Sequence, residues 1–273
     1  SSRFSDLLFF CRRCGVEQSP RVILVTNDDG IAAAGLAALA EAMEALGEVC
    51  VVAPDRERST VGHSLTLHRP LRVEQIGTRL FAVNGMPADC VNLGILGLLP
   101  VPPSLVVSGI NHGGNLGDDV TYSGTVSAAM EGALAGIRSI ALSQVYSKEG
   151  VGNAVSFDAA EQWGEKVLRP LVDTRFASRT LVNVNFPAVT GGEVRGIRVV
   201  RQGFHDYGRG SVVEGIDPRG FPYFWFGLHG IEHTPGADSD LEAISAGYVS
   251  VTPLHVDLTH EASLGMLAER YSA

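Results

Sequence analysis

Two adjacent aspartates follow a hydrophobic run in the segment RVILVTNDDG, which places Asp28 and Asp29 where a buried strand should end. Neighbouring carboxylates repel one another and raise each other's proton affinity, so the pair needs a cation, strong hydrogen-bond donors or open solvent. Asn, Asp and Gly are also ordinary turn formers, so the segment alone fits a solvated turn as well. The rest of the sequence has to separate a binding site from a turn.

Further oxygen donors follow two later strand-like segments. Ser59 comes after APDRER, and Asn111 ends the segment SGIN. Carboxylate, hydroxyl and amide oxygens are hard ligands that suit Mg²⁺ or Mn²⁺, whereas Zn²⁺ favours thiolates and imidazoles. Together with Asp28 and Asp29, these residues predict a site for one divalent cation per subunit. Such a cation, when it keeps bound water, can activate that water and polarise a phosphoryl oxygen.

A second polar cluster lies in the segment NHGGNLGDDVTYSGTVSAAMEG, residues 111–132. A glycine-rich loop runs into SGT at the start of a predicted helix, where the first backbone amides have no helical partners and bind phosphate well. Ser123, Gly124 and Thr125 are therefore candidate phosphate-binding residues, although a simple helix cap explains the serine equally well. The chain lacks the Walker and dinucleotide-binding glycine patterns, which disfavours redox chemistry with a nucleotide cofactor.

Strand-like and helix-like segments alternate over the first half of the chain. RVILVT precedes GLAALAEAMEALG, VCVVAP precedes PADCVNLGILGLL, and SLVVSG leads through the glycine-rich loop to TVSAAMEGALAG. This alternation predicts an α/β fold with a Rossmann-like, mostly parallel sheet and helices on both faces. Sites in such folds lie beyond the carboxyl ends of the strands, and the unusual polar residues all occur there.

The pattern changes after about residue 145. FDAAEQWGEKVLRPLV predicts a helix, and TLVNVNFP and RGIRVVRQG predict strands that complete the sheet. Residues 204–240 are rich in Gly, Pro, His and aromatic residues and predict a projecting β-hairpin arm with YFWF as one strand. Residues 241–273 predict a further strand and a terminal helix. Because exposed aromatic arms usually mark subunit contacts, we expect this part of the chain to take part in oligomerisation.

Composition narrows the class of partner. The formal net charge of -9 offers no basic field for polymeric DNA or RNA, and no run of eighteen apolar residues predicts a membrane span. The four cysteines, Cys11, Cys14, Cys50 and Cys90, form no disulfide framework, so we expect a cytoplasmic protein. Residues 1–20 are expected to be a disordered or peripheral extension, because no second cysteine pair follows CRRC at a metal-site spacing.

Six parts of the chain carry a family resemblance: ILVTNDDGI, VVAPDRERS with GHSLT, GMPADCV, VVSGIN, GGNLGDDVTYSGTVSAAMEG and GYVSVTPL. Together they resemble the SurE family, the stationary-phase survival proteins that are metal-dependent 5'/3'-nucleotidases. The resemblance runs from about Arg21 to the C-terminus, so residues 21–273 are interpreted as one SurE-like α/β domain. It implies homodimers or homotetramers built with the C-terminal arm and helix.

The resemblance also implies an activity and its residues. The activity is hydrolysis of nucleoside monophosphates to nucleoside and phosphate, with short polyphosphate as a further substrate of some members. The implied metal ligands are Asp28, Asp29, Ser59 and Asn111. The residues expected to bind substrate phosphate are Asn115, Ser123, Gly124, Thr125 and His63.

The expected mechanism is direct attack of a metal-activated water on phosphorus, with Asp28, Asp29 and Asn111 as the catalytic group. Asp29 is the expected general base. His63 either protonates the leaving ribose oxygen or holds its loop by hydrogen bonds. Asn115, Ser123 and Thr125 would stabilise the equatorial phosphoryl oxygens.

Two other functions compete with hydrolysis. A regulatory module with the same loops would bind a nucleotide without releasing phosphate. A sugar-nucleotide-dependent transferase would need a second large α/β domain, for which residues 146–273 are too short and too irregular.

Overall fold

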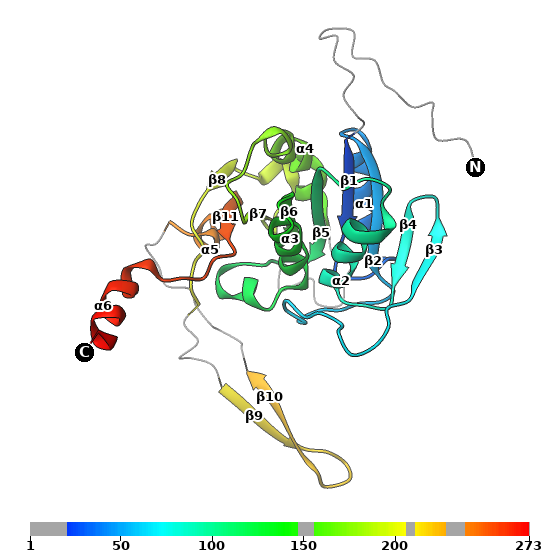
Figure 1. Ribbon diagram of the computed structural model, residues 1–273. Coiled ribbons are helices and arrows are strands. Elements are labelled where there is room, and N and C mark those ends of the chain that lie inside the picture. Colours follow the sequence, from blue (N-terminus) through cyan, green and yellow to red (C-terminus); the bar gives the residue numbers. More distant parts are fainter. Residues whose placement is uncertain (1–20, 147–155, 206–210, 228–237, 273) are drawn as a thin grey trace.

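The computed structural model describes residues 21–146, 156–205, 211–227 and 238–272. In this part of the chain, one nine-stranded sheet carries helices on both faces (Figure 1). The predicted α/β fold is confirmed. The expected extension at residues 1–20, with Cys11 and Cys14, lies outside the described residues.

The sheet is mixed but mostly parallel, in the order β3-β4-β2-β1-β5-β6-β7-β11-β8. Neighbouring strands are parallel except in the pairs β3–β4 and β7–β11. The short edge strand β3, which is mostly exposed, and its neighbour β4 were not among the predicted elements. The strands are β1 (Val22–Thr26), β2 (Glu48–Pro54), β3 (Val73–Gly77), β4 (Leu80–Val83), β5 (Leu105–His112), β6 (Arg138–Gln144), β7 (Thr180–Phe186), β8 (Ile197–Val199) and β11 (Val249–His255).

The α-helices are α1 (Ala34–Glu44), α2 (Pro87–Leu93), α3 (Gly124–Leu134), α4 (Asp158–Asp173), α5 (Asp240–Ser245) and α6 (Glu261–Tyr271). Shorter helical turns are η1 (Gly94–Leu98), η2 (Gly117–Thr121) and η4 (Gly191–Glu193). The segment PADCVNLGILGLL, predicted as one helix, continues from α2 into the π-helical turn η1 at Gly94. Among the described helices, none is long and apolar enough to span a membrane.

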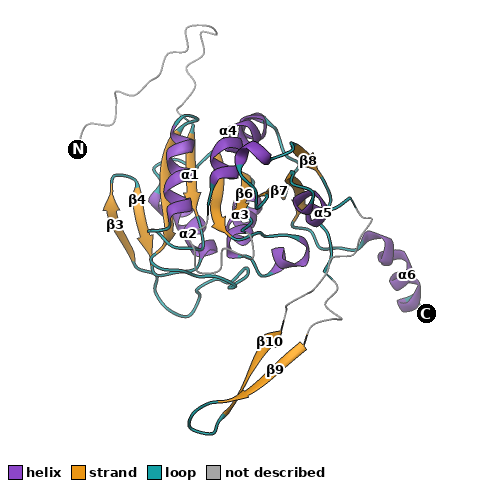
Figure 2. Ribbon diagram, turned by 180° about the vertical axis from the view of Figure 1, so that it is seen from behind, coloured by secondary structure: helices purple, strands orange, loops and turns teal. Residues whose placement is uncertain are grey.

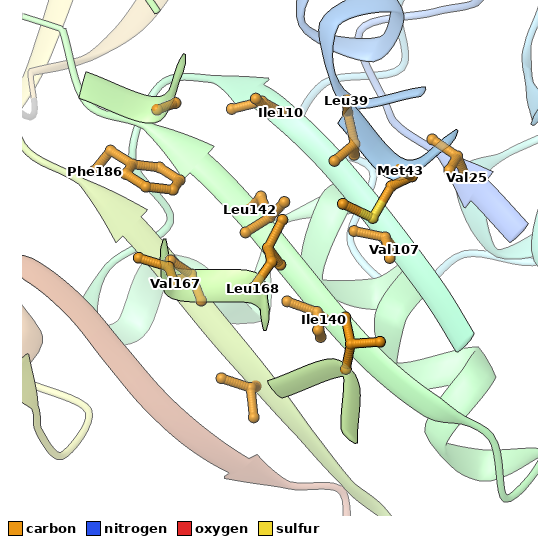
Figure 3. Close-up of a cluster of buried hydrophobic side chains, with 14 of the residues drawn as sticks. Val25, Leu39, Met43, Val107, Ile110, Ile140, Leu142, Val167, Leu168 and Phe186 are labelled. Atoms are coloured by element: carbon orange, nitrogen blue, oxygen red, sulfur yellow. The ribbon is translucent and has the colours of Figure 1, made fainter. Parts of the chain in front are cut away.

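The core has two sides because successive side chains of a strand point to opposite faces of the sheet. Ile23 and Val25 of β1 pack with residues of α1 and α4, whereas Leu24 packs with residues of α2 and α3. The central strands are therefore buried on both faces, which explains why β1 is apolar throughout. Figure 3 shows the α1/α4 side, where residues from two helices meet those of three central strands, among them Val25, Leu39, Met43, Val107, Ile140, Leu142, Val167 and Leu168.

Strand order creates a crevice at the centre of the sheet. From β1 the chain continues to β2 and β4 on one side, whereas β5, β6 and β7 follow one another on the other side. β1 and β5 are thus parallel neighbours, with Thr26 opposite Ser108, and the connections that leave them run in opposite directions. Such a switch point is where α/β proteins bind ligands. The parallel pairing of β1 with β5 brings the residues that follow β1 close to the end of β5.

The hairpin of β9 (Ser211–Ile216) and β10 (Pro222–Gly227) forms a separate two-stranded sheet. It stands away from the body of the molecule in both views (Figures 1 and 2). The ends of the expected arm do not project: His205 donates its backbone N–H to Asp118, and the buried Asp240 accepts the N–H of Gly117. Within the expected arm at residues 204–240, the described projecting part is therefore the hairpin.

Alanine substitutions at two helical glycines should have opposite effects. A Cβ atom at Gly35 in α1 would overlap the carbonyl oxygen of Ile110, so Gly35→Ala should lower the free energy of unfolding by about 1–3 kcal/mol. Gly164 in α4 has nothing within 4 Å of an added Cβ, so Gly164→Ala should raise the free energy of unfolding by about 0.5–1 kcal/mol. Urea unfolding measures both changes. A Gly35→Ala protein as stable as the wild type would contradict the close packing of α1 on β5.

Candidate active site

The end of β1 meets the beginning of α3. Asp28 is only 4% exposed, and the Thr125 hydroxyl donates a hydrogen bond to its carboxylate. The helix comes so close that a Cβ atom at Gly124 would lie 2.8 Å from Asp28 Oδ2. Only glycine fits at this position without a shift of the helix or the carboxylate. This contact joins the first aspartate of the pair to the SGT segment of the glycine-rich loop.

Both carboxyl groups of the pair are poorly solvated. Burial raises the pKa of Asp28 to about 6; the Thr125 hydrogen bond opposes the rise, and the charge of Asp29 adds to it. Burial also raises the pKa of Asp29, opposed by the backbone N–H of His112, which donates to Asp29 Oδ2 at 3.1 Å. The charged forms of both groups are thus disfavoured, and a bound cation would offset that cost.

The loop after β2 reaches the same edge of the sheet. The backbone N–H of Arg58 donates to the carbonyl oxygen of Asp28 at 2.7 Å, so the neighbouring Ser59 lies next to the end of β1. The Ser59 hydroxyl donates to Glu57 Oε1 at 2.8 Å. Because that bond uses the hydroxyl hydrogen, the lone pairs of the Ser59 oxygen are left for a cation.

Asn111 lies near the end of β5, directly before the residue that binds Asp29. Its side-chain Nδ2 donates to the carbonyl oxygen of Gly113 at 2.8 Å. The bond uses the amide nitrogen, so the amide oxygen is the atom that can bind a cation. Through His112 and Arg58, therefore, backbone hydrogen bonds bring the loops of Asn111 and Ser59 to the aspartate pair.

Ser123 is the N-cap of α3, and its role in phosphate binding stays a prediction. Its hydroxyl oxygen accepts the backbone N–H of Val126 at 3.1 Å, and its carbonyl oxygen accepts the Ser127 hydroxyl at 2.6 Å. The amides at the first helical positions, Gly124 and Thr125, have no acceptor within the helix. They carry the positive end of the helix dipole beside Asp28.

Asn115 is held in the interior by two asparagines that the sequence analysis missed. Its N–H donates to Asn185 Oδ1 at 2.8 Å, and its carbonyl oxygen accepts the side-chain amides of Asn183 and Asn185. Its own Nδ2 donates to Ser143 Oγ at 2.7 Å. The signal was present in TLVNVNF, where two asparagines alternate with apolar residues in a buried strand. The glycine-rich loop is thus fixed to β6 and β7.

His63 is bound to a carboxylate on α3. Its Nε2 lies 2.6 Å from Glu131 Oε1, and Asn92 of α2 donates to the other oxygen of Glu131 at 3.0 Å. The N–H of Gly62 donates to the carbonyl oxygen of Tyr122 at 3.0 Å. These contacts hold the loop of His63 against α3 and the residue Tyr122 that precedes its cap, as the structural interpretation of His63 expects. Sequence reasoning missed Glu131, a lone carboxylate in a helix of small and apolar residues.

The donor set decides which metal fits. Across residues 21–146, 156–205, 211–227 and 238–272, no three His, Cys, Asp or Glu side chains form a cluster that could hold a metal ion. The candidate set at the β1 edge instead combines two carboxylates with a hydroxyl and an amide oxygen. Such a set suits a hard, partly hydrated cation such as Mg²⁺ or Mn²⁺ better than Zn²⁺.

These features define a class of protein: a doubly wound α/β protein whose site lies at the switch point between β1 and β5. Two poorly solvated carboxylates attract a cation, and the adjoining N-terminus of α3 attracts an anion. The arrangement suits a metal ion together with a phosphate group.

Comparison with known proteins gives the family: the chain belongs to the SurE family. The family model described as "Survival protein SurE" matches residues 23–209. A relative from Erythrobacter litoralis, named 5'-nucleotidase SurE, is 55% identical over 251 residues, which are 91% of this chain and 99% of that protein. One of the same name from Geobacter sulfurreducens is 50% identical over 90% of this chain and 92% of its own. The crystal structure of the SurE protein from Aquifex aeolicus superposes with a TM-score of 0.78 at 42% identity, over 91% of this chain and 99% of that one.

The buried charge of Asp28 should destabilise the metal-free protein at neutral pH. Because the pKa is about 6 in the folded protein and 3.8 in the reference state, the folded form binds more protons between these values, and stability falls as pH rises through them. Asp28→Asn keeps an oxygen acceptor for Thr125 and removes the charge. In chelator at about pH 7.5 it should therefore raise the free energy of unfolding by up to about 3 kcal/mol, with the gain lost below about pH 4.

Asp89→Asn is the matched control for this measurement. Asp89 is also 4% exposed, but its carboxylate accepts the backbone N–H groups of Thr66 and Met86 at 2.9 and 2.8 Å. Its substitution should lower stability at about pH 7.5, because an amide is the weaker acceptor. Thermal unfolding at the two pH values compares the variants. An Asp28→Asn protein less stable than the wild type in chelator at the higher pH would show that Asp28 serves only to shape a turn.

Proposed function

We propose that this chain is a divalent-metal-dependent 5'-nucleotidase that hydrolyses nucleoside monophosphates to nucleoside and phosphate. The observation that carries the proposal is the contact of Thr125 with Asp28, which joins a carboxylate pair to a helix N-terminus suited to phosphate. Relatives that are 50–55% identical over about nine-tenths of the chain and are named 5'-nucleotidase SurE support the same reaction.

Oxygen donors from three loops would hold the metal. The proposed ligands are Asp28, Asp29, Ser59 and Asn111. A bound Mg²⁺ or Mn²⁺ supplies a more acidic water and a positive charge for the phosphoryl oxygens.

The chain's own groups orient the substrate and move the proton. The amide of Gly124 is proposed to donate to a phosphoryl oxygen at the N-terminus of α3, and Ser123 and Asn115 are proposed to flank the phosphate. Asp29 accepts the proton of the attacking water. This carboxylate is less buried than Asp28, and its raised pKa lies closer to neutrality than that of an ordinary aspartate, which suits a general base. The hydrogen bond from His112 to Oδ2 leaves Oδ1 to receive the proton.

We infer that the hairpin of β9 and β10, together with α6, joins subunits into a homodimer or homotetramer. Phe224, Trp225 and Phe226 are 62%, 68% and 83% exposed, and α6 has no buried residue. A two-stranded hairpin with both faces in water is marginally stable, so a partner surface would account for its apolar residues.

The buried thiols of Cys50 and Cys90, both free, support the proposal of a reducing, cytoplasmic location.

Phosphate release tests the proposed reaction. Nucleoside monophosphates and short polyphosphate are assayed with Mg²⁺, Mn²⁺ or Zn²⁺ and with chelator, and release should require Mg²⁺ or Mn²⁺. Asp29→Asn should lower kcat for AMP by about 100-fold or more, because it removes the general base and one anionic ligand. Asp173→Asn, which removes the carboxylate that binds Arg21 at the end of α4, should keep wild-type turnover. Near-normal turnover in Asp29→Asn would contradict the site, and nucleotide binding without phosphate release by the wild type would favour a regulatory module.

Replacing the hairpin should lower the oligomeric state. A variant in which a short Gly-Ser linker replaces residues 211–227 should show a smaller mass by light scattering coupled to size exclusion, because the exposed aromatic strand is lost. Phe224→Ser with Phe226→Ser changes one face of β10, and Tyr223→Ser with Trp225→Ser changes the other, since alternate residues of a strand share a face. The pair that lowers the mass identifies the contact face. If the protein without the hairpin has the same number of subunits per particle as the wild type, the arm is not an interface.

A further inference from the structure

A pocket of about 410 Å³ opens beside Asp29 on the α1 side of the sheet edge. It is lined by residues 33–35 at the beginning of α1, by Asp29 and Glu57, and by His112 and Phe157. Its volume lies within the range of pockets that hold small organic ligands. Asp29 is the residue that this pocket shares with the proposed metal site.

The walls of the pocket are of two chemical kinds. His112 and Phe157 contribute ring side chains; His112 is packed against Tyr146 with ring centroids 5.3 Å apart, and Phe157 is packed against the core. Glu57 and Asp29 offer carboxylate oxygens, which accept hydrogen bonds. Ring faces suit a planar heterocycle, and carboxylates suit hydroxyl donors such as those of a ribose.

The charge in the pocket distinguishes it from the α3 side of the site. The Glu57 carboxylate, which is not a proposed metal ligand, repels a phosphate group, so the pocket suits an uncharged ligand part. On the other side of the sheet edge, the N-terminus of α3 attracts an anion. A molecule with a phosphate at one end and an uncharged, planar group at the other would therefore be oriented across Asp29.

We propose that this pocket binds the nucleoside part of the substrate, with Phe157 and the His112 ring flanking the base and Glu57 accepting the ribose hydroxyls. The proposal rests on the proposed nucleotidase function and adds to it the residues that select the substrate. Glu57 also accepts the Ser59 hydroxyl, so it links ribose binding to the loop of a proposed metal ligand.

Phe157→Leu tests the base contact, because leucine keeps an apolar side chain and removes the ring face. KM for AMP should rise at least about fivefold, as expected for the loss of base stacking. KM for glycerol 2-phosphate, which has neither base nor ribose, should not change. Phe176→Leu is the matched control: Phe176 is partly buried against the same core as Phe157 but lines a different pocket, so neither KM should change. Equal effects of Phe157→Leu on both substrates, or no effect on either, would overturn the base assignment.

Glu57→Gln tests the ribose contact and keeps an oxygen acceptor for Ser59. The wild type should prefer AMP over 2'-deoxy-AMP by about tenfold in kcat/KM, as expected for a hydrogen bond to a charged group. The variant should bring this ratio toward one. A wild-type ratio near one, or an unchanged ratio in the variant, would overturn the ribose assignment.

Adenosine separates the pocket from the reaction, because it carries no phosphate. In calorimetry the wild type and Phe176→Leu should bind adenosine alike, and Phe157→Leu should bind it at least about fivefold more weakly. Adenosine binding that depends on Phe157, in a protein that releases no phosphate from AMP, would support the pocket and refute the nucleotidase function. Phosphate release from AMP, in a protein that neither binds adenosine nor is inhibited by it, would refute the pocket and leave the nucleotidase function standing.

Discussion

The approach of α3 to the carboxylate of Asp28 is the constraint on which the site depends. Thr125 can donate to Asp28 only because Gly124 has no side chain in the way, and Ser123 fixes where the helix begins. The same closeness continues along the helix: a Cβ atom at Gly132 would lie 2.8 Å from Val106 Cγ2 on β5. Small residues along α3 therefore allow its N-terminus to lie at the end of β1, where the cation and the phosphate are proposed to bind.

The two faces of the sheet carry different side chains: one face is apolar and stabilises the fold, and the other is polar near the proposed site. On the α1/α4 face the central strands present an apolar cluster that is buried throughout. On the α3 face, toward the carboxyl ends of the strands, the buried side chains become polar, and Asn183 and Asn185 of β7 hold the backbone of Asn115. Buried polar groups cost free energy unless they are paired, and the oxygen of Asn27, beside the aspartate pair, has no hydrogen-bond partner. The apolar face offsets this cost, as is common where a site requires polar or charged groups in the interior.

Local patterns in the sequence predicted much of this arrangement. The contacts between segments that are distant in the sequence were not predicted. The alternation of strands and helices predicted the sheet, and SGT predicted a helix start at Ser123, because both depend on neighbouring residues. The pairing of His63 with Glu131, 68 residues apart, depends on how the helices lie over the sheet, which alternation does not fix. The contact of Asn115 with Asn185, 70 residues apart, likewise depends on strand order. The exposed strand β3 was missed because it contributes little apolar periodicity.

Two helix N-termini face the switch point from opposite sides of the sheet, and their surroundings differ in charge. The N-terminus of α3 has a serine cap and lies against a single buried carboxylate, which a metal ion would neutralise. The N-terminus of α1 has no side-chain cap at Ala33, and it opens into the pocket lined by Glu57 and Asp29. Glu57 is not a proposed metal ligand, so a cation held by Asp29 would leave the Glu57 carboxylate uncompensated. An anion is thus favoured at α3 and disfavoured at α1, although both helix N-termini carry the positive end of a helix dipole. In the proposed site, the direction in which an amphipathic phosphate ester lies would therefore follow from where the carboxylates are, and not from the helix dipoles alone.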